Sequence, residues 1–336
     1  MQTWDAVVVG AGPAGCAAAY DLVTAGKRVL LLDKALFPRH KLCAGGLTIK
    51  SLQRLRYSVA PVVHHASARM GVGHAYQQRV EFQTAAPVCA LVERSEFDAY
   101  CFARTCAAGA HFEQIVGVSD VIETADEVVL TLTNGRQLHT RYLLAADGAH
   151  SPLRKLLGAN KPHMAVGLEA LVPRESCSNE AIFRFDFGVI GQGYGWVFPK
   201  RDHYNVGLYT RKPDLYPLAK AALRDYVGFT LGSEALVDLR GFPIPTGAGV
   251  QPEGFQRCFL IGDAGGYAEQ LLGEGIHNAI ASGQNAALAL LNAQGGPALS
   301  AFRTAQQPLQ NDILRCTMAA RCFYGLLPIG FRLLQV

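Results

Sequence analysis

Residues 7–15 of the chain read VVVGAGPAG, an apolar run that passes directly into the glycine pattern G-x-G-x-x-G. Small residues follow from Cys16 to Tyr20, and a second apolar run, Val29 to Leu32, ends at Asp33, eighteen residues after Gly15. This order predicts a buried strand, a tight turn, a helix and a second buried strand. Such a unit forms a dinucleotide pocket, because its glycines let backbone N–H groups approach a pyrophosphate at the helix N-terminus.

An acidic residue at the end of the second strand completes such a pocket, since its carboxylate accepts hydrogen bonds from ribose hydroxyls. An isolated G-x-G-x-x-G match would fit an ordinary turn before a core helix, but the flanking strands and Asp33 favour the nucleotide interpretation. The residues expected to bind the nucleotide are Gly10, Gly12, Pro13, Ala14, Gly15, Asp33 and Lys34.

The composition narrows the class of protein. The chain has 336 residues, of which 50% are hydrophobic and 17% are charged, with a net charge of +4. At about 150 residues per domain this length predicts two domains, and the weak charge, without a dense basic cluster, argues against nucleic acid as a partner. Nine cysteines without C-x-x-C or zinc spacing predict reduced thiols and no metal site. With no secretory signal in the sequence, a cytoplasmic location is expected.

The middle of the chain alternates between strand and helix patterns. Short strands are expected at about 79–82, 88–92, 128–133, 136–140 and 142–146, with Asn134-Gly135 as a hairpin turn. Ser95, followed three residues later by Asp98, is expected to cap a helix that reaches about Ala107. From about residue 161 to 252 the pattern becomes one of alternating strands.

Aromatic residues dominate two of these strands. Phe183, Phe185 and Phe187 alternate with Arg184 and Asp186, which predicts a half-buried antiparallel strand with the aromatic side chains on its buried face. Trp196 and Phe198 repeat the pattern, and Gly191 and Gly193 are expected to turn the chain so that the two strands become antiparallel neighbours. Two interpretations stay open: the aromatic face packs against a neighbouring domain, or it lines an apolar cavity.

A late glycine segment indicates a cofactor longer than a nicotinamide dinucleotide. The buried run Cys258 to Ile261 ends at Gly262-Asp263, where a carboxylate can bind a ribitol hydroxyl of FAD. A helix is expected from about Ile276 to Leu291, directly after Gly273 and Gly275. The positive end of its dipole would suit an electron-rich reduced ring.

With Asp147-Gly148 between the first and last motifs, the chain resembles the glutathione-reductase-2 type flavoproteins, the fold of the aromatic hydroxylases. Residues 38–47 (PRHKLCAGGL) and 193–200 (GYGWVFPK) are similar to the geranylgeranyl reductase family, whose members saturate isoprenoid double bonds. The resemblance implies an α/β fold with a Rossmann-like FAD-binding domain (1–70, 94–160 and 253–296). It also implies a mostly antiparallel β substrate domain (71–93 and 161–252) and a C-terminal helical segment (297–336).

The resemblance also implies residue roles: the cysteine–glycine loop lies against the flavin, Arg94 approaches the cofactor, and the tryptophan strand lines the substrate cavity. The further cofactor residues it implies are Arg39, Cys43, Ala44, Gly45, Gly46, Arg94, Asp147, Gly148, Gly262, Asp263, Gly273, Gly275 and Ile276. The substrate residues it implies are Phe185, Phe187, Trp196 and Phe198.

Cys43 has two interpretations, a plain buried thiol or a catalytic thiol beside the flavin, and the resemblance favours the second. Arg39 and Lys41 are either solvated loop charges or partners for phosphates of FAD or NADPH. The sequence has no second G-x-G-x-x-G, and NAD(P)H is expected as a transient electron donor.

Three functions are consistent with these features. The leading hypothesis is an FAD-dependent reductase that transfers a hydride from reduced flavin to a C=C bond of a hydrophobic, prenyl-bearing substrate. The first alternative is a flavin-dependent monooxygenase or halogenase that acts through a flavin hydroperoxide, and the second is a flavin-binding carrier without catalysis.

The C-terminal stretch Ile313 to Val336 mixes apolar residues with arginines and is broken by Gly325, Pro328 and Gly330. It is therefore too broken to span a bilayer, which needs about twenty continuous apolar residues. A helix packed over the substrate domain is the favoured prediction, with peripheral contact to a membrane surface as the alternative.

Overall fold

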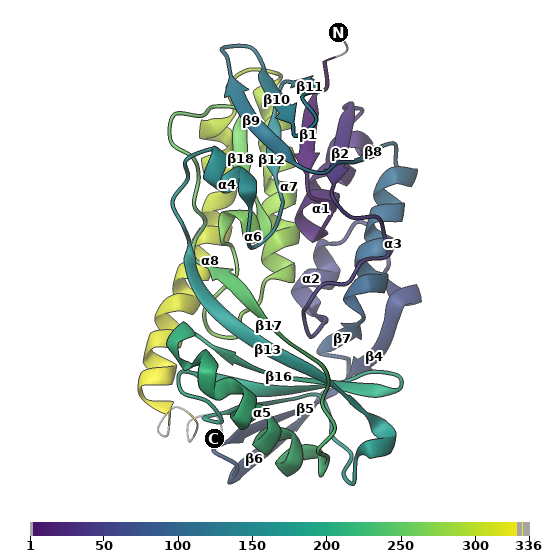
Figure 1. Cartoon of the computed structure of the whole chain (residues 1–336), viewed down its shortest axis with the longest axis vertical. Helices are drawn as coiled ribbons and strands as arrows, with labels where there is room; N and C mark the ends of the chain where they lie inside the picture. The colour runs from purple at the N-terminus through teal and green to yellow at the C-terminus, as the bar shows by residue number, and fades with distance from the viewer. Residues whose placement is uncertain (1–2, 328–330, 332–336) are drawn as a thin grey trace.

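A parallel sheet of five strands forms one end of the molecule in this computed structural model, which describes residues 3–327 and 331 (Figure 1). Its strand order is β18-β12-β1-β2-β8, and all neighbours are parallel. The strands are β1 (Ala6–Val9), β2 (Val29–Asp33), β8 (His111–Gln114), β12 (Leu143–Ala145) and β18 (Cys258–Leu260). Every residue of β1, β2, β12 and β18 is buried, as the uninterrupted apolar runs predict for a sheet covered on both faces.

Helices cover one face of this sheet and a small sheet covers the other. The helices are α1 (Pro13–Thr24), α3 (Arg94–Ala107) and α7 (Ile276–Ala293), with the shorter α2 (Ile49–Arg54) and α6 (Gly262–Gly265) nearby, whereas α4 (Pro152–Leu156) packs with the small sheet. The small sheet consists of β9 (Val118–Glu123), β10 (Val128–Leu132) and β11 (Gln137–Thr140), and the predicted Asn134-Gly135 hairpin joins the last two.

The predicted cap at Ser95 is wrong. Helix α3 begins one residue earlier, at Arg94, and Glu93 occupies the N-cap position without a side-chain hydrogen bond. Ser95 therefore lies inside the first helical turn, where it lacks the extended backbone that a capping residue needs.

A second sheet of seven strands forms the other end of the molecule, with the order β17-β13-β16-β15-β14-β5-β6. Its strands are β5 (Arg69–His74), β6 (Gln78–Gln83), β13 (His163–Pro173), β14 (Arg184–Phe187), β15 (Gly193–Pro199), β16 (His203–Thr210) and β17 (Val237–Thr246). All neighbours are antiparallel except β14 and β5. A small sheet of β3 (Gly46–Thr48), β4 (Val63–Ser67) and β7 (Cys89–Val92) lies beside it.

Helix α5 (Tyr216–Leu231) packs on one face of the large sheet, and this corrects the prediction that β14 is half-buried. Arg184 and Asp186, expected on a solvated face, are only 8% and 5% exposed. The guanidinium donates two hydrogen bonds of 2.7 and 2.6 Å to the carboxylate, and the Tyr226 hydroxyl of α5 donates a third of 2.6 Å. The alternating pattern identified two faces of the strand, but the helix that covers the second face comes about forty residues later in the chain.

The final helix, α8 (Leu299–Gly325), runs along one side of the molecule from the parallel sheet towards the large sheet (Figure 1). It packs on α7, and near its end Ala320 and Tyr324 join the aromatic cluster of the large sheet, as the favoured prediction for this segment expects. Helix α8 ends at Gly325, one of the expected breaks, and the other two, at Pro328 and Gly330, lie outside the described residues. Among the described helices, none combines the length and apolar character needed to cross a membrane.

Candidate functional site

The glycine turn between β1 and α1 has no room for a side chain at Gly10 or Gly15. A Cβ on Gly10 (φ +107°) would lie 2.2 Å from the Ala146 carbonyl oxygen, and one on Gly15 would lie 1.9 Å from the Gly10 oxygen. The Ala11 N–H donates a 2.7 Å hydrogen bond to Asp33 Oδ2, which joins the turn to the end of β2. Helix α1 begins without a side-chain cap, so its N-terminus suits an anionic group such as a pyrophosphate.

Arginine side chains line the approach to this turn. An Arg39 nitrogen lies 3.4 Å from the position of a Cβ on Gly12 and 3.2 Å from Asp98 Oδ2. Arg94 donates two hydrogen bonds of 2.9 Å to the same carboxylate. Burial lowers the pKa of Arg94, but the neighbouring Asp98 and Cys43 raise it by more, so the guanidinium stays charged. Asp98, predicted only as part of a helix start, thus holds both arginines.

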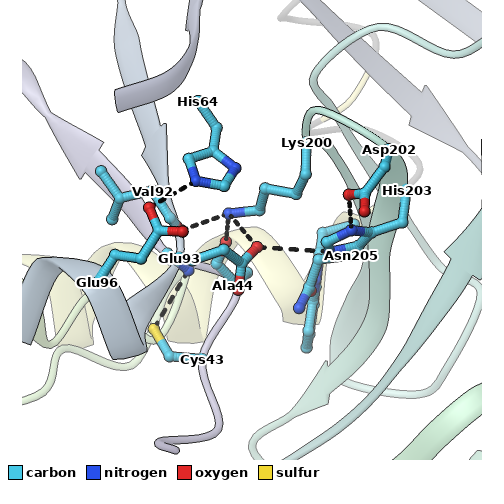
Figure 2. Close-up of polar contacts among 12 residues, drawn as sticks. Cys43, Ala44, His64, Val92, Glu93, Glu96, Lys200, Asp202, His203 and Asn205 are labelled. Atoms are coloured by element: carbon cyan, nitrogen blue, oxygen red, sulfur yellow. Dashed lines mark hydrogen bonds and ion pairs between the residues drawn. The ribbon is translucent and has the colours of Figure 1, made fainter. Parts of the chain in front are cut away.

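The Cys43 loop is fixed by a buried lysine that the sequence analysis did not single out (Figure 2). Lys200 Nζ, at the end of β15, donates hydrogen bonds of 2.8 Å to the Ala44 carbonyl and 2.5 Å to the Val92 carbonyl. It also lies 3.7 Å from Glu93 Oε1, and burial lowers its pKa. A Cβ on Gly45 (φ +70°) would lie 2.0 Å from the Val92 oxygen, so only glycine permits this approach.

Three separate segments meet where the late glycine motif was predicted. A Cβ on Gly262 (φ +57°) would lie 2.8 Å from the Ala14 side chain, so the first and last motifs are in contact. Lys41 Nζ lies 3.9 Å from Asp263 Oδ2, which links the Cys43 loop to the same point. Asp263 Oδ1 in turn lies 3.7 Å from the position of a Cβ on Gly275, just before α7.

Asp147 has a different role from the other predicted residues. Its carboxylate accepts hydrogen bonds of 2.5 Å from Ser151 Oγ and 3.0 Å from the Leu153 N–H, and Ser151 caps α4. Asp147 and Gly148 (φ +83°) therefore build the turn after β12. Through Ala146, this turn contacts Gly10.

The loop before α7 is held from several sides. Buried Glu269 accepts hydrogen bonds from the backbone N–H groups of Leu271, Leu272 and Glu274 at 2.5, 2.8 and 2.9 Å. The hydroxyl groups of Tyr194, Tyr209 and Tyr324 donate to the carbonyls of Leu272, Gln270 and Leu271, respectively. These tyrosines come from β15, β16 and α8. The sequence analysis missed Glu269, whose signal is a single acid inside an apolar, glycine-rich segment.

The predicted aromatic residues share one face of the large sheet. Phe185 is paired with Trp196, and β14 and β15 are antiparallel neighbours as predicted. Trp196 Nε1 donates a 2.8 Å hydrogen bond to Asn205, and the Phe198 ring lies 2.8 Å from the position of a Cβ on Gly46. Phe187 contacts Phe323 of α8, with the ring centres 4.8 Å apart. The aromatic face therefore lies against the Cys43 loop and α8.

The geometry fits FAD, because glycine turns, arginines and the N-terminus of α7 come together from segments far apart in the sequence. Residues 3–175 match the FAD binding domain family. A menaquinone reductase of Mycobacterium tuberculosis is 32% identical over 84% of this chain and 75% of its own length. A geranylgeranyl diphosphate reductase of Rhodobacter capsulatus is 30% identical over 86% of this chain and 75% of its own length.

Solved structures show the same fold. A geranylgeranyl bacteriochlorophyll reductase-like protein of Thermoplasma acidophilum superposes with a TM-score of 0.82 at 21% identity, covering 97% of this chain and 89% of its own. A flavin-dependent brominase superposes with a TM-score of 0.76 at 18% identity, covering 98% of this chain and 89% of its own. The predicted α/β fold of the aromatic-hydroxylase type is confirmed. The FAD binding domain family matches more than half of the chain, and the geranylgeranyl diphosphate reductase is similar over most of it. This chain is therefore an FAD-dependent oxidoreductase of the geranylgeranyl reductase family.

Proposed function

We propose that this protein reduces carbon–carbon double bonds of a hydrophobic, prenyl-bearing substrate. The observation that carries the proposal is the aromatic face of the large sheet, which meets the Cys43 loop through Phe198 and Gly46. An apolar wall beside a flavin suits an isoprenoid chain, whose binding depends on buried apolar area rather than on hydrogen bonds. The names of the menaquinone and geranylgeranyl diphosphate reductases support this substrate class.

The proposed FAD site extends from the β1–α1 turn to the N-terminus of α7. Gly10, Gly12, Pro13, Ala14 and Gly15 receive the pyrophosphate, with Asp33 and Lys34 at the ribose and Arg39 near the phosphates. The isoalloxazine end contacts Cys43, Ala44, Gly45, Gly46, Gly262, Asp263, Gly273, Gly275 and Ile276. Arg94, through Asp98, positions Arg39, and Asp147 and Gly148 form the turn that packs against Gly10. When bound and reduced, FAD supplies the hydride, and NAD(P)H is the proposed donor of its electrons.

This assignment divides the chain as the family resemblance implies, with FAD-binding segments 1–70, 94–160 and 253–296 and substrate segments 71–93 and 161–252. The pairing of β5 with β14, and of β6 with β5, supports the inclusion of the early segment in the substrate domain. Residues 297–327 then form a C-terminal segment that packs on α7 and donates a hydrogen bond from Tyr324 to the loop before α7.

A mass measurement tests the function directly. The purified protein should be yellow and release FAD. With dithionite under anaerobic conditions, it should add two mass units to geranylgeranyl diphosphate or to the prenyl chain of menaquinone. Incorporation of oxygen or halide, only in air, would instead identify the monooxygenase or halogenase alternative, which the likeness to the brominase fold keeps as the second candidate. Bound FAD without any reaction would identify a carrier.

A cytoplasmic protein with a peripheral membrane contact is the proposed location, since a prenyl lipid has to leave its bilayer. Leu314, Met318 and Leu326 are 49%, 60% and 57% exposed near the end of α8, beside Arg315 and Arg321. Apolar side chains flanked by arginines favour an anionic lipid surface. Sedimentation with phosphatidylglycerol vesicles should therefore exceed that with phosphatidylcholine vesicles, and Met318→Glu should reduce it.

A further inference from the structure

One carboxyl group interrupts the aromatic face of the large sheet. Across the sheet, a row of paired residues runs from Glu169 on β13 to Gly207 on β16, Trp196 on β15 and Phe185 on β14. Gly207 leaves space for the Trp196 ring, since a Cβ there would lie 2.1 Å from the indole. The Glu169 carboxyl group therefore lies on the same face as Trp196, only one strand beyond the ring.

This carboxyl group is buried without a matching cation. Glu169 is 4% exposed, and its Oε2 has no hydrogen-bond partner among the described residues. No described arginine or lysine lies within ion-pair distance of it. By contrast, the buried arginines Arg94 and Arg184 are each paired with an aspartate. A buried acid in such surroundings favours the neutral, protonated form.

The groups that face Glu169 come from several other segments. The Cys43 backbone, the Asn205 side chain of β16 and Lys200, directly after β15, lower its pKa, and Glu93, before α3, raises it. Burial outweighs them and raises the pKa of Glu169 to about 7. On the far side, Arg240 of β17 is its sheet neighbour but is exposed and paired with Asp238. His203 lies on β16 and faces Glu93 at 3.4 Å.

We propose that Glu169 is the proton donor of the site, in place of Cys43. The inference rests on the proposed function, because reduction of a double bond needs one proton and one hydride. The hydride from the reduced flavin forms one C–H bond, and the Glu169 carboxyl proton forms the other. The two π electrons of the alkene become the bond to that proton, the flavin is oxidised by two electrons, and Glu169 is left as a carboxylate. Water then returns the proton.

The same geometry makes Asn205 a positioning residue. It accepts the Trp196 Nε1 hydrogen bond and lies beside Glu169, so it fixes the acid relative to the aromatic wall. The backbone of Cys43, and not its thiol, is the part of this residue that lowers the pKa of Glu169. Cys43→Ala should consequently keep the proton step.

Glu169→Gln tests the proposal in the FAD-loaded protein, because it removes the proton and keeps the shape. The first measurement is an infrared difference spectrum between wild type and Glu169→Gln. It should show a carboxylic-acid carbonyl band at pH 6 that disappears by pH 9. The second is the rate at which a prenyl alkene reoxidises the reduced flavin, which should fall by roughly 10²-fold or more in the variant. Reduction by dithionite and FAD content should not change.

Glu169→Asp should restore part of the rate, and Asp202→Asn, at an exposed carboxylate of the β15–β16 turn, should leave it unchanged. Absence of the infrared band overturns the proposal whether or not any alkene reacts. Alkene reduction by Glu169→Gln at the wild-type rate overturns it as well, while the proposed function stands. A wild-type enzyme that reduces no alkene refutes the proposed function separately, because the infrared result does not depend on turnover.

Discussion

The two faces of the large sheet bury ionisable groups in opposite ways. On the face under α5, Arg184, Asp186 and Tyr226 satisfy one another with three hydrogen bonds of 2.6–2.7 Å. On the face towards the Cys43 loop, Glu169 lies buried with an oxygen that has no partner among the described residues. A paired cluster is costly to break, whereas an unpaired acid is costly to keep. The first face therefore serves stability, and the second holds a group ready to react.

The largest expected effect is on the paired face. Asp186→Ala would leave the Arg184 guanidinium buried without its partner, which costs about 3–5 kcal/mol of unfolding free energy. Chemical denaturation of the FAD-loaded protein measures this. The folded fraction should retain its FAD and its turnover, because these side chains lie on the face of β14 opposite the predicted substrate residues Phe185 and Phe187. A loss below about 1 kcal/mol, or loss of FAD from folded protein, would break the distinction between the faces.

The reactive face should respond to pH with the opposite sign. The Glu169 pKa rises from 4.5 to about 7 on folding, so its contribution is fully favourable below pH 4.5 and is lost as pH increases through 7. Glu169→Gln carries no such titration. Its stability relative to wild type should therefore increase between pH 5 and 8, by up to about 3 kcal/mol. If the unfolding free energies of the two proteins change with pH in the same way, Glu169 is not held in its protonated form in the folded protein.

Cofactor affinity should separate Asp263 from Cys43. Asp263→Ala would remove a charged contact to FAD worth about 1.5–3 kcal/mol, or roughly tenfold to a hundredfold in affinity. Cys43→Ala should keep the yellow colour, because Lys200 still holds the loop backbone when the 3.4 Å hydrogen bond from the Gly45 N–H to the Cys43 sulfur is lost. Equilibrium titration of both apoproteins with FAD checks this. Equal affinities in the two variants would remove Asp263 from the site.

The smallest expected effect tests the aromatic wall. Trp196→Phe keeps a ring but loses the hydrogen bond to Asn205 and part of the apolar surface. It should lower kcat/KM for a long prenyl substrate by about tenfold, close to 1.4 kcal/mol of transition-state stabilisation. Steady-state kinetics and thermal melting on the same variant decide the role of the residue. Unchanged kinetics beside a depressed Tm would make Trp196 a packing residue only.

Local spacing was sufficient for the cofactor half of the molecule and insufficient for the large sheet. The strand, turn and acid of residues 7–33 depend on neighbours in sequence, so their pattern predicted the turn and the position of Asp33 at the end of β2. The burial of Arg184 and Asp186 depends on α5, and the Lys200 and Glu269 contacts depend on segments that fold back from elsewhere. Glu169 and Glu269 do share one signal, a single charge in an apolar run, and that signal points to a buried partner or a function, whereas Lys200 is followed directly by the charged residues Arg201 and Asp202.

The three tyrosine hydroxyls on the loop before α7 have a consequence for biosynthesis. One of them belongs to Tyr324, so this loop lacks one of its hydrogen bonds until that residue has left the ribosome. The β1–α1 turn, by contrast, can form from the first fifth of the chain, once β2 has appeared. A nascent chain can thus form the turn that binds the nucleotide part of FAD long before it completes the loop beside the isoalloxazine ring. Full loading with flavin is therefore expected only after Tyr324 has emerged and α8 has packed.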